Sequence, residues 1–402
     1  MVSTPRHGEK SRPTPSPFAR LAALLDAVAP GLPPIDLSLG EPKHPVPDFV
    51  GPVLAAHTAD FGRYPPIRGT PDFREAVARW LDRRFGAGAM LDAERGILPL
   101  NGSREGLFSA ALAAVAYAKK RVGHPAILLP NPFYPVYAAA AEAAGAEPVF
   151  LPAGPATGFL PDLTGVPADV LARTVAIYYA SPANPQGAVA SRESLAALIR
   201  LAGAHDILVF SDECYSELYR GDAAPPGILE AAADVGRSAA NLVAFNSLSK
   251  RSNLPGLRCG FAAGDPDFLA FWAGIRNVIA PQVPMPVQAV AVAALGEEAH
   301  VAANRRLYDE KFAAAAAILG TKFGYATPPG GFFLWLDMTA LGGGEAAALR
   351  LWRNAGVKVV PGSYLAAGTD APSGPGWAYV RVAMVESLAA TEGAMRRLAQ
   401  FA

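Results

Sequence analysis

The chain has little of several features that mark special classes of protein. Its 402 residues include only two cysteines, Cys214 and Cys259, without a CxxC or histidine spacing. This argues against a disulfide framework or a cysteine-based metal site, so we predict buried free thiols and no metal. Lys+Arg and Asp+Glu number 35 each. Bulk electrostatics therefore favours neither nucleic acid nor an anionic membrane as a partner, and a small-molecule site is the better expectation.

Long hydrophobic runs and common nucleotide motifs are also missing. No stretch reaches the roughly 18 apolar residues of a membrane span. Residues 1–17 are polar and proline-rich and lack the apolar centre of a secretory signal. We therefore expect a flexible N-terminal arm over residues 1–17, no membrane partner and a cytoplasmic location. Neither a Gly-x-Gly-x-x-Gly fingerprint nor a Walker loop occurs, which argues against those two nucleotide sites.

The residues that are present are typical of a folded α/β protein. Hydrophobic residues make up 51% of the chain and charged residues 17%, enough for a large domain and a smaller one. As far as about Ala263, short apolar segments alternate with alanine-rich helical segments, a pattern typical of a mainly parallel sheet covered on both faces. Helical spacing is clearest over Phe18–Val28, Asp72–Phe85 and Glu105–Lys120.

The C-terminal part predicts a second, smaller α+β unit. Helical segments cover Pro266–Ala280 and Gln288–Leu319, the latter broken near Gly296. Strands and helices then alternate, with strands from Gly330, at Val357–Val360 and at Tyr379–Met384, and helices at Glu345–Ala355 and the C-terminus.

Lys250 lies in the segment Asn246–Gly260, which follows an apolar run typical of a buried strand. It is therefore placed just past a strand end, in a turn rich in hydroxyl groups, proline and glycine. Burial and the nearby Arg251 and Arg258 would lower the pKa of its amine, which suits a nucleophile that forms a Schiff base with an aldehyde. An ordinary loop lysine explains this stretch equally well.

Other side chains follow predicted strands, at the edge where ligands bind in such sheets. Asp212 ends an apolar strand, where a carboxylate needs a cation or a protonated heterocycle. Tyr215 comes three residues later, and Asn184 lies between two prolines. Tyr134 follows another strand and could stack on a planar ligand, although a core aromatic is as good an interpretation.

Three further positions suggest contacts with anions. Gly102 and Ser103 begin a helical segment, where free N–H groups suit a phosphate, although Ser103 could be an ordinary helix cap. Arg381 lies within an apolar strand and needs an anion, either a ligand carboxylate or a structural ion-pair partner. Gly40 ends a short strand and would let the backbone approach a ligand, or form a plain turn.

Together these segments resemble the fold-type I, class I aminotransferases that use pyridoxal phosphate, from about Phe18 to the end of the chain. The motifs stand in the family's order: Asn184–Gly187, Asp212–Tyr215, Ser247–Lys250 with Arg258, and Arg381. The resemblance implies an α/β fold with a large cofactor-binding domain, built on a mainly parallel seven-stranded sheet between helices, and a smaller α+β domain. The expected domain ranges are 18–48 and 296–402 for the small domain and 49–295 for the large one.

The resemblance also implies roles for the residues around the cofactor ring. Lys250 is expected to bind the cofactor covalently and to carry the proton between the substrate's α-carbon and C4′ of the cofactor. Asp212 is expected to pair with the pyridine N–H and keep the ring cationic. Tyr215 and Asn184 would hydrogen-bond the phenolic oxygen of the ring, and Tyr134 would stack on it.

The remaining implied contacts hold the two anionic groups. The substrate's α-carboxylate would bind Arg381, Asn184 and the backbone at Gly40. The family likeness implies a homodimer with shared active sites, in which one residue of the phosphate site comes from the second subunit. The implied phosphate ligands are Gly102, Ser103, Arg104, Ser247, Arg258 and, from the second subunit, Tyr64, which locally could be a packed loop aromatic.

Within the family, the longer matching stretches are most similar to the bacterial N-succinyldiaminopimelate aminotransferases of lysine biosynthesis; they are Gly40–Pro45, Asn101–Phe108, Ser211–Glu217, Ser249–Gly256 and Pro361–Leu365. The likeness implies amino transfer from N-succinyl-LL-2,6-diaminopimelate to 2-oxoglutarate. Lys43 and His44 are candidates for binding the substrate's extra carboxylates, with ordinary loop residues as the alternative. Ile279–Pro284 departs from this subgroup.

Two other classes of function are consistent with the same scaffold. One is an aminotransferase of aspartate, alanine or aromatic amino acids, or a β-lyase. The other is a noncatalytic regulator that senses an effector. Such regulators carry a DNA-binding domain of roughly a hundred residues ahead of the aminotransferase-like part, whereas only about 17 residues precede the first predicted helix here. We therefore expect an enzyme.

Overall fold

The computed structural model describes residues 16–120, 123–368 and 371–401. Most of the predicted flexible arm, residues 1–17, lies outside the described residues. The first helix, α1 (Pro17–Leu25), begins within the range predicted for the arm, because Ser16 caps it and its Oγ accepts a hydrogen bond from the Ala19 N–H at 3.1 Å.

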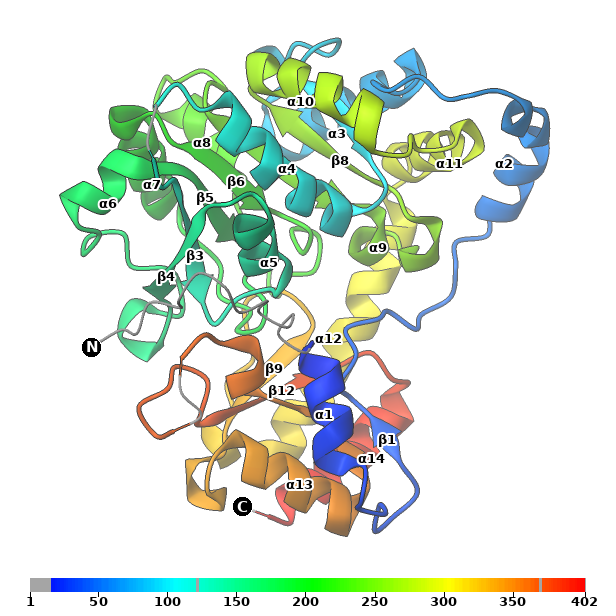
Figure 1. Ribbon diagram of the computed structural model, residues 1–402. Coiled ribbons are helices and arrows are strands. Elements are labelled where there is room, and N and C mark those ends of the chain that lie inside the picture. The colour runs from blue at the N-terminus through cyan, green and yellow to red at the C-terminus, as the bar shows by residue number, and fades with distance from the viewer. Residues whose placement is uncertain (1–15, 121–122, 369–370, 402) are drawn as a thin grey trace.

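A seven-stranded sheet forms the centre of the larger part of the molecule (Figure 1). Its strand order is β2-β8-β7-β6-β5-β3-β4, and only β8 runs antiparallel to its neighbours. The predicted mainly parallel sheet is therefore confirmed. The strands are β2 (Ile97–Leu100), β3 (Ala126–Asn131), β4 (Glu147–Pro152), β5 (Thr174–Ala180), β6 (Leu208–Asp212), β7 (Leu242–Ser247) and β8 (Gly260–Gly264).

Helices cover both faces of this sheet because its strands carry apolar side chains on both sides. Neighbouring residues of β2 illustrate the alternation: Ile97 packs in the same core as Trp80, whereas Leu98 packs in the core that contains Trp272. Helices α3 (Pro71–Phe85), α6 (Ala168–Arg173), α7 (Arg192–His205), α8 (Ile228–Asp234) and α11 (Met285–Gly296) share the first core, and α4 (Ser103–Tyr117), α5 (Val136–Ala143) and α10 (Pro266–Ile279) share the second.

Helix α3 shows how local sequence sets the boundaries of an element. Thr70 caps its start by accepting a hydrogen bond from the Phe73 N–H at 3.2 Å, and Pro71 fits the first helical position. Gly86 ends it in the left-handed conformation at φ +62°. The buried face includes Trp80, as the helical spacing predicts. The predicted helix is confirmed over nearly its full length.

A smaller unit packs beside the large sheet (Figure 1). Its strands form an antiparallel sheet in the order β11-β12-β9 and a parallel pair, β1-β10. The elements are β1 (Ile35–Asp36), β9 (Phe333–Asp337), β10 (Val357–Lys358), β11 (Val360–Pro361), β12 (Tyr379–Ala383), α12 (Ala299–Leu319), α13 (Gly344–Ala355) and α14 (Leu388–Ala399). The predicted helix break near Gly296 is confirmed, since α11 ends there and α12 begins at Ala299.

The single strand predicted at Val357–Val360 is wrong. The chain changes partners at this point: Val357 and Lys358 pair with β1, whereas Val360 pairs with Arg381 of β12. A continuous apolar run gives no sign of such a change, because both halves are buried. The remaining short elements are α2 (Val50–Ala56), α9 (Leu248–Arg251) and the 3₁₀ turns at Thr58–Gly62, Gly88–Met90, Pro155–Thr157, Pro255–Leu257, Lys322–Gly324, Thr339–Leu341 and Gly362–Leu365.

The register of the large sheet brings several strand ends to one edge. Gly260, the first residue of β8, pairs with Leu100 on one side and with Ser247 on the other. In the next strands, Asp212 pairs with both Ala180 and Phe245. The segments that leave β2, β5, β6 and β7, and the segment that enters β8, therefore lie together.

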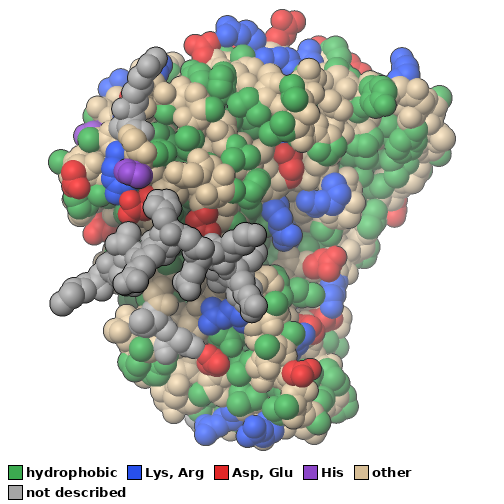
Figure 2. Space-filling view, viewed as in Figure 1, with side chains coloured by type: hydrophobic (Ala, Val, Ile, Leu, Met, Phe, Trp, Pro, Cys, Tyr) green, Lys and Arg blue, Asp and Glu red, His purple; other side chains and the backbone are tan. Residues whose placement is uncertain are grey.

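Two properties of the whole molecule complete the description. None of the described helices combines the length and apolar character that crossing a bilayer requires. Basic and acidic side chains lie in small, mixed groups over the face shown in Figure 2, as the equal numbers of the two charges suggest. The predicted domain limits at residues 48/49 and 295/296 stay predictions.

Candidate active site

Lys250 is the amine at the centre of this edge. It lies in the single turn α9, which directly follows β7, and its Nζ donates a hydrogen bond to the Gly40 carbonyl at 2.5 Å. The Phe332 ring centroid lies 5.1 Å from the same nitrogen. Burial is the main cause that lowers the pKa of the Lys250 ammonium to about 8. An ordinary solvated loop lysine does not have these surroundings.

The charges near Lys250 differ from those that the sequence suggested. Arg381 and Arg104 are the like charges that contribute to its lowered pKa. Arg251, which we expected to contribute, instead donates to the Ala294 carbonyl at 2.7 Å and pairs with Glu298 at 2.6 Å. The sequence placed Arg251 next to Lys250, but adjacent residues in a helical turn point in different directions.

Asp212 provides the carboxylate of the site at the end of β6. Its Oδ2 accepts a hydrogen bond from the Tyr137 hydroxyl at 2.6 Å, and its Oδ1 accepts one from the Cys214 N–H at 3.2 Å. Burial raises the pKa of this carboxyl group. Among the described residues no Lys or Arg pairs with Asp212. The position therefore suits a protonated heterocycle, one of the two partners that the sequence suggested.

Tyr137 is a contact that the sequence analysis missed. Its fully buried ring stacks on Tyr178, with centroids 4.5 Å apart and an interplanar angle of 11°. Burial and the Asp212 charge raise its pKa well above the usual value, so the hydroxyl is a fixed donor. The signal that was available is weak: Tyr137 follows Tyr134 by three residues near the start of a helix.

The first turn of α4 lies against the side chain of Arg258. Gly102, the N-cap residue, supplies no side-chain cap and has φ +82°. A Cβ at this position would lie 2.2 Å from Nη2 of Arg258, so glycine is required for the guanidinium to lie against the turn. Arg258 itself adopts the left-handed conformation at φ +55°, which is rare for arginine and typical of functional sites. Its Nη2 donates to the Asn101 carbonyl at 3.3 Å.

Three other predicted phosphate ligands lie at or near this turn. Ser103 and Arg104 are the first two residues of α4. The Nε of Arg104 donates to the Tyr134 hydroxyl at 2.6 Å, which places the Tyr134 ring beside the same turn. Ser247 is buried at the end of β7, and its Oγ donates to the Ser249 Oγ at 2.9 Å.

Arg381 is the buried cation of the site. It is 5% exposed, and its guanidinium donates to Asn184 Oδ1 at 3.2 Å and to the Ser38 carbonyl at 2.8 Å. Its Cζ lies 4.3 Å from the Phe333 ring centroid, and its Nε has no hydrogen-bond partner. Within the described part of the chain no carboxylate pairs with Arg381. The structural ion pair that was the rival interpretation is therefore not found there.

Tyr215 lies between these groups. It is 9% exposed, and its ring packs edge-on against Phe332 at 5.3 Å and against Phe333 at 5.9 Å. Burial raises its pKa well above the usual value, and the charges of Arg381 and Asp212 act on it in opposite directions. The charges of Arg381 and Asp212 therefore both influence the Tyr215 hydroxyl.

Three residues from the sequence analysis lie apart from this cluster. Tyr64 is 96% exposed in the single chain. Lys43 forms an ion pair with Glu386, and His44 contacts Asn304 and Lys311. Lys43 and His44 therefore contact protein groups in the single chain, and their predicted role in binding a substrate carboxylate stays a prediction.

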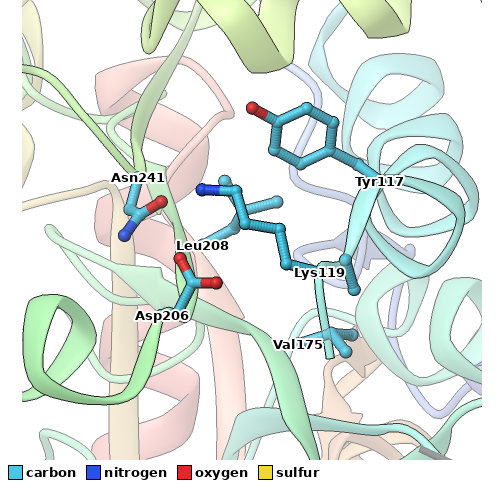
Figure 3. A pocket seen from close by; sticks show the side chains of 7 residues that line it. Tyr117, Lys119, Val175, Asp206, Leu208 and Asn241 are labelled. Atoms are coloured by element: carbon cyan, nitrogen blue, oxygen red, sulfur yellow. The ribbon is translucent and has the colours of Figure 1, made fainter. Parts of the chain in front are cut away.

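A small hollow at the other end of the strands is a separate feature (Figure 3). Val175 and Leu208, near the starts of β5 and β6, line it together with Lys119, Asp206 and Asn241. Its volume of about 10 Å³ leaves room for little more than one water molecule. It therefore has no part in the site at the opposite edge of the sheet.

Comparison with known proteins agrees with this geometry. The family described as aminotransferase class I and II matches residues 33–398. A relative described as LL-diaminopimelate aminotransferase, from Syntrophobacter fumaroxidans, is 34% identical over 381 residues, which are 93% of this chain and 92% of that protein.

Two solved structures share the fold. The crystal structure of an aminotransferase from Neisseria meningitidis has a TM-score of 0.90 and 38% identity, covering 96% of this chain and 98% of the other. A probable N-succinyldiaminopimelate aminotransferase from Thermus thermophilus has a TM-score of 0.82 and 28% identity, covering 96% and 100%. The chain therefore belongs to the class I and II aminotransferases, which depend on pyridoxal phosphate.

Proposed function

We propose that the protein transfers the amino group of N-succinyl-LL-2,6-diaminopimelate to 2-oxoglutarate, giving N-succinyl-2-amino-6-oxopimelate and glutamate, in lysine and diaminopimelate biosynthesis. The transaminase chemistry follows from the family, whereas the amino donor is the proposal. The resemblance of several sequence stretches to the succinyl-specific enzymes supports it, as does the likeness to the Thermus protein. The cytoplasmic location expected from the sequence stays a prediction.

The residues present fit pyridoxal phosphate. The turn at Gly102, in which Arg258 occupies the space of a side chain, is a seat for the phosphate. Asp212, which is buried and has no cationic partner in the described ranges, would pair with the ring N–H, and Tyr134 would lie against the ring. When bound, the cofactor supplies an electron sink for the charge that develops at the substrate's α-carbon.

Arg381 is the single observation on which the substrate class depends. A buried guanidinium that has no acidic partner among the described residues, and whose Nε has no hydrogen-bond partner there, requires an anion to offset its desolvation. A substrate α-carboxylate beside Asn184 would supply it, with two parallel hydrogen bonds. Burial lowers the pKa of Arg381 to about 10, so the group stays charged at neutral pH. The site therefore selects amino and oxo acids.

Lys250 is then the group that moves the proton at the α-carbon. With its pKa lowered to about 8, its amine gains and loses a proton near neutral pH, which is the condition for efficient general acid and base catalysis. The hydrogen bond to Gly40 and the packing against Phe332 hold its side chain. Asn184, which accepts a hydrogen bond from Arg381 at 3.2 Å, would help to orient the substrate carboxylate. Tyr215 and Asn184 would also hydrogen-bond the phenolic oxygen of the ring.

LL-diaminopimelate itself is the second candidate donor, because the Syntrophobacter relative is described as an LL-diaminopimelate aminotransferase. We expect purified enzyme with 2-oxoglutarate to form glutamate at least about tenfold faster from N-succinyl-LL-diaminopimelate than from LL-diaminopimelate, aspartate, alanine or phenylalanine, because contacts to the succinyl arm add binding energy. The measurement is kcat/KM for each donor.

The same panel separates the alternatives. Preference for LL-diaminopimelate replaces the proposed donor, and preference for aspartate, alanine or an aromatic donor places the enzyme elsewhere in the family. Release of pyruvate from a cysteine conjugate would indicate a β-lyase. Lys43→Ala tests the predicted carboxylate contact: if KM for the succinylated donor stays unchanged, Lys43 serves only its ion pair with Glu386.

We also propose a homodimer in which each site receives Tyr64 from the second subunit. Several exposed hydrophobic residues support this proposal, because a second subunit would shield them from water. Tyr64 is 96% exposed, and Val278, at the end of α10, is 84% exposed. Pro281, just beyond α10, accepts a hydrogen bond from Asn101 at 2.5 Å, so the exposed end of α10 adjoins the turn at Gly102. Exposed apolar patches of this kind are typical of interfaces.

Mixing two inactive variants tests the shared site. We expect Lys250→Ala and Tyr64→Ala subunits, refolded or co-expressed together, to recover activity, because one site of each mixed dimer would then be intact. Each variant alone stays far below wild type. If mixing restores no activity although mixed dimers form, Tyr64 acts within its own subunit or has no role.

A further inference from the structure

The segment Gly40–Pro45, here called the strap, connects the smaller unit to the large sheet. It leaves β1 and runs towards α2, passing over the turn that carries Lys250. Both of its ends contact that turn: the Gly40 carbonyl accepts from Lys250 Nζ at 2.5 Å, and the Pro45 carbonyl accepts from Asn253 Nδ2 at 3.1 Å. The strap therefore bounds the space around the Lys250 amine.

A chain of side chains ties the middle of the strap to the backbone of Lys250. Lys311 Nζ lies 2.7 Å from His44 Nε2, and His44 Nδ1 lies 2.6 Å from Asn304 Oδ1. Asn304 Nδ2 then donates to the Lys250 carbonyl at 3.1 Å. Both Lys311 and Asn304 belong to α12. One helix thus holds the strap and the Lys250 turn together.

The two ends of this side-chain network, the Lys311 ammonium and the Lys250 carbonyl, set the direction of each hydrogen bond between them. Burial lowers the pKa of Lys311 to about 8, so below that pH Lys311 is mainly an ammonium, which has donors only. His44 Nε2 then accepts from Lys311. The neutral ring then carries its proton on Nδ1 and donates to Asn304 Oδ1. That contact leaves the Asn304 amide N–H₂ facing the Lys250 carbonyl, which can only accept. The chain is complete only when His44 is neutral.

The network of His44, Asn304 and Lys311 is largely buried, and among the described residues no carboxylate contacts these three side chains. Lys311 is 2% exposed and Asn304 is 5% exposed, and Lys311 also donates to the Met384 carbonyl at 3.2 Å. The His44 ring lies 4.5 Å from the Tyr308 ring. Buried polar groups in such a network are costly when they lose a partner.

The charged groups around His44 come from four segments. Lys311 and Tyr308 face it from α12. Lys43 and Glu41 belong to the strap. Lys250 lies in α9, and Glu386 follows β12. The carboxylate of Glu386 is already paired with Lys43. A protonated His44 ring would therefore be repelled by the Lys311 ammonium, and no carboxylate of the described residues contacts the ring to offset this repulsion.

We propose that His44, Asn304 and Lys311 are positioning residues for Lys250, which hold the strap against α12 and so fix the place of the Lys250 amine relative to the Gly40 carbonyl. The inference rests on the role proposed for Lys250 and does not depend on the amino donor. It also gives His44 a role different from the carboxylate binding that the sequence suggested.

The arrangement predicts sensitivity to mild acid. Burial and then Lys311 lower the pKa of His44 below its usual value of 6.5, and the Asn304 hydrogen bond only partly opposes this. A histidine with a lowered pKa in the folded state contributes its stabilisation above the unfolded pKa and loses it as the pH falls below that value. Neutral His44 therefore holds the strap at pH 7.5, and protonation releases the strap progressively as the pH falls below 6.5 towards the lowered pKa of the folded state.

Three variants distinguish a role of the hydrogen-bonded network in holding the strap from a role of the His44 side chain in packing alone. His44→Gln keeps one acceptor and one donor but does not titrate. His44→Leu removes both. The double variant His44→Leu with Lys311→Met also removes the buried ammonium. It therefore leaves no unpaired buried charge that would destabilise the fold and hide the effect on the strap. The matched control is His57→Gln, since His57 is exposed at the end of α2 and its ring contacts Asp60 in the 3₁₀ turn that follows.

Trypsin gives a readout of the strap itself, because the bond after Lys43 is cut only when the strap opens. At pH 7.5 we expect both leucine variants to be cut there about tenfold faster than wild type, whereas His44→Gln and His57→Gln stay close to wild type. The rate is measured by mass spectrometry on the full-length protein, with and without pyridoxal phosphate.

Equilibrium dialysis of pyridoxal phosphate against cofactor-free protein gives the readout at Lys250. We expect both leucine variants to bind about tenfold more weakly at pH 7.5. Between pH 7.5 and 6.0, wild type should lose more affinity than His44→Gln does. Faster cutting with unchanged cofactor affinity would show a structural anchor only and overturn the proposal, as would leucine variants that match wild type in both assays.

A Lys250→Ala variant distinguishes failure of the positioning proposal from failure of the proposed function. If Lys250→Ala binds the cofactor as tightly as wild type, the role given to Lys250 is wrong. If Lys250→Ala binds weakly and the leucine variants bind normally, only the positioning by His44, Asn304 and Lys311 is refuted.

Discussion

Lys250→Ala abolishes transamination, with kcat reduced by about four orders of magnitude or more, because the variant lacks both the nucleophile and the group that moves the α-carbon proton. The residue lies at a strand end, hydrogen-bonded to Gly40, with a pKa lowered to about 8. The measurement is glutamate formation from the best donor in the presence of saturating pyridoxal phosphate. Borohydride treatment followed by peptide mapping adds a second readout, since wild type carries the reduced cofactor on residue 250.

The control for this result is another lysine of the chain. Lys322 lies in an exposed 3₁₀ turn, and Lys322→Ala should retain wild-type turnover and wild-type labelling. If Lys250→Ala keeps more than about a hundredth of the activity, the general acid and base has to be another group. Label on a different lysine would refute the assignment directly.

Asp212→Asn lowers kcat by about 10²–10³-fold, because a neutral amide does not hold the ring nitrogen of the cofactor in its protonated form. Asp212 is buried and hydrogen-bonded to Tyr137 and Cys214, and no Lys or Arg of the described part of the chain pairs with it. Asp212→Glu keeps the charge and should recover part of the rate. The measurement is the single-turnover rate of the half-reaction with the amino donor, which excludes product release.

Tyr137→Phe is the companion variant, since it removes the hydroxyl at 2.6 Å from Asp212 and keeps the ring that stacks on Tyr178. Loss of one hydrogen bond to a buried carboxylate should cost about tenfold in the same rate. Wild-type rates for Asp212→Asn would show that the carboxylate has no role in the chemistry. Equal losses in Asp212→Asn and Tyr137→Phe would show that Tyr137 contributes more than orientation.

The sequence was a good guide wherever a residue directly follows a strand. Asp212, Lys250 and Asn184 each come at or just after an apolar run, and parallel strands deliver such residues to one edge. The helix break near Gly296 could also be predicted, because a glycine between two helical patterns is a local signal. These features depend on residues that are close together in the sequence, so they can be recognised without the structure.

Contacts between distant segments were not predictable in the same way. Nothing near Tyr137 shows that its hydroxyl meets Asp212, 75 residues later, and nothing near His44 indicates Lys311, 267 residues later. The split of Val357–Val360 into two strands likewise depends on which partners are available. Such pairings are set by tertiary packing, and a single sequence carries little information about them.

The reversed direction of β8 links two parts of the site mechanically. Because β8 returns alongside β7, the loop between them is short, and Lys250 and Arg258 are carried on one connection whose ends are pinned at Ser247 and Gly260. A crossover helix between parallel strands would have carried them apart. Any insertion in this connection would displace the amine and the phosphate-side guanidinium at once, so engineering of this enzyme should leave the loop's length untouched and vary other connections instead.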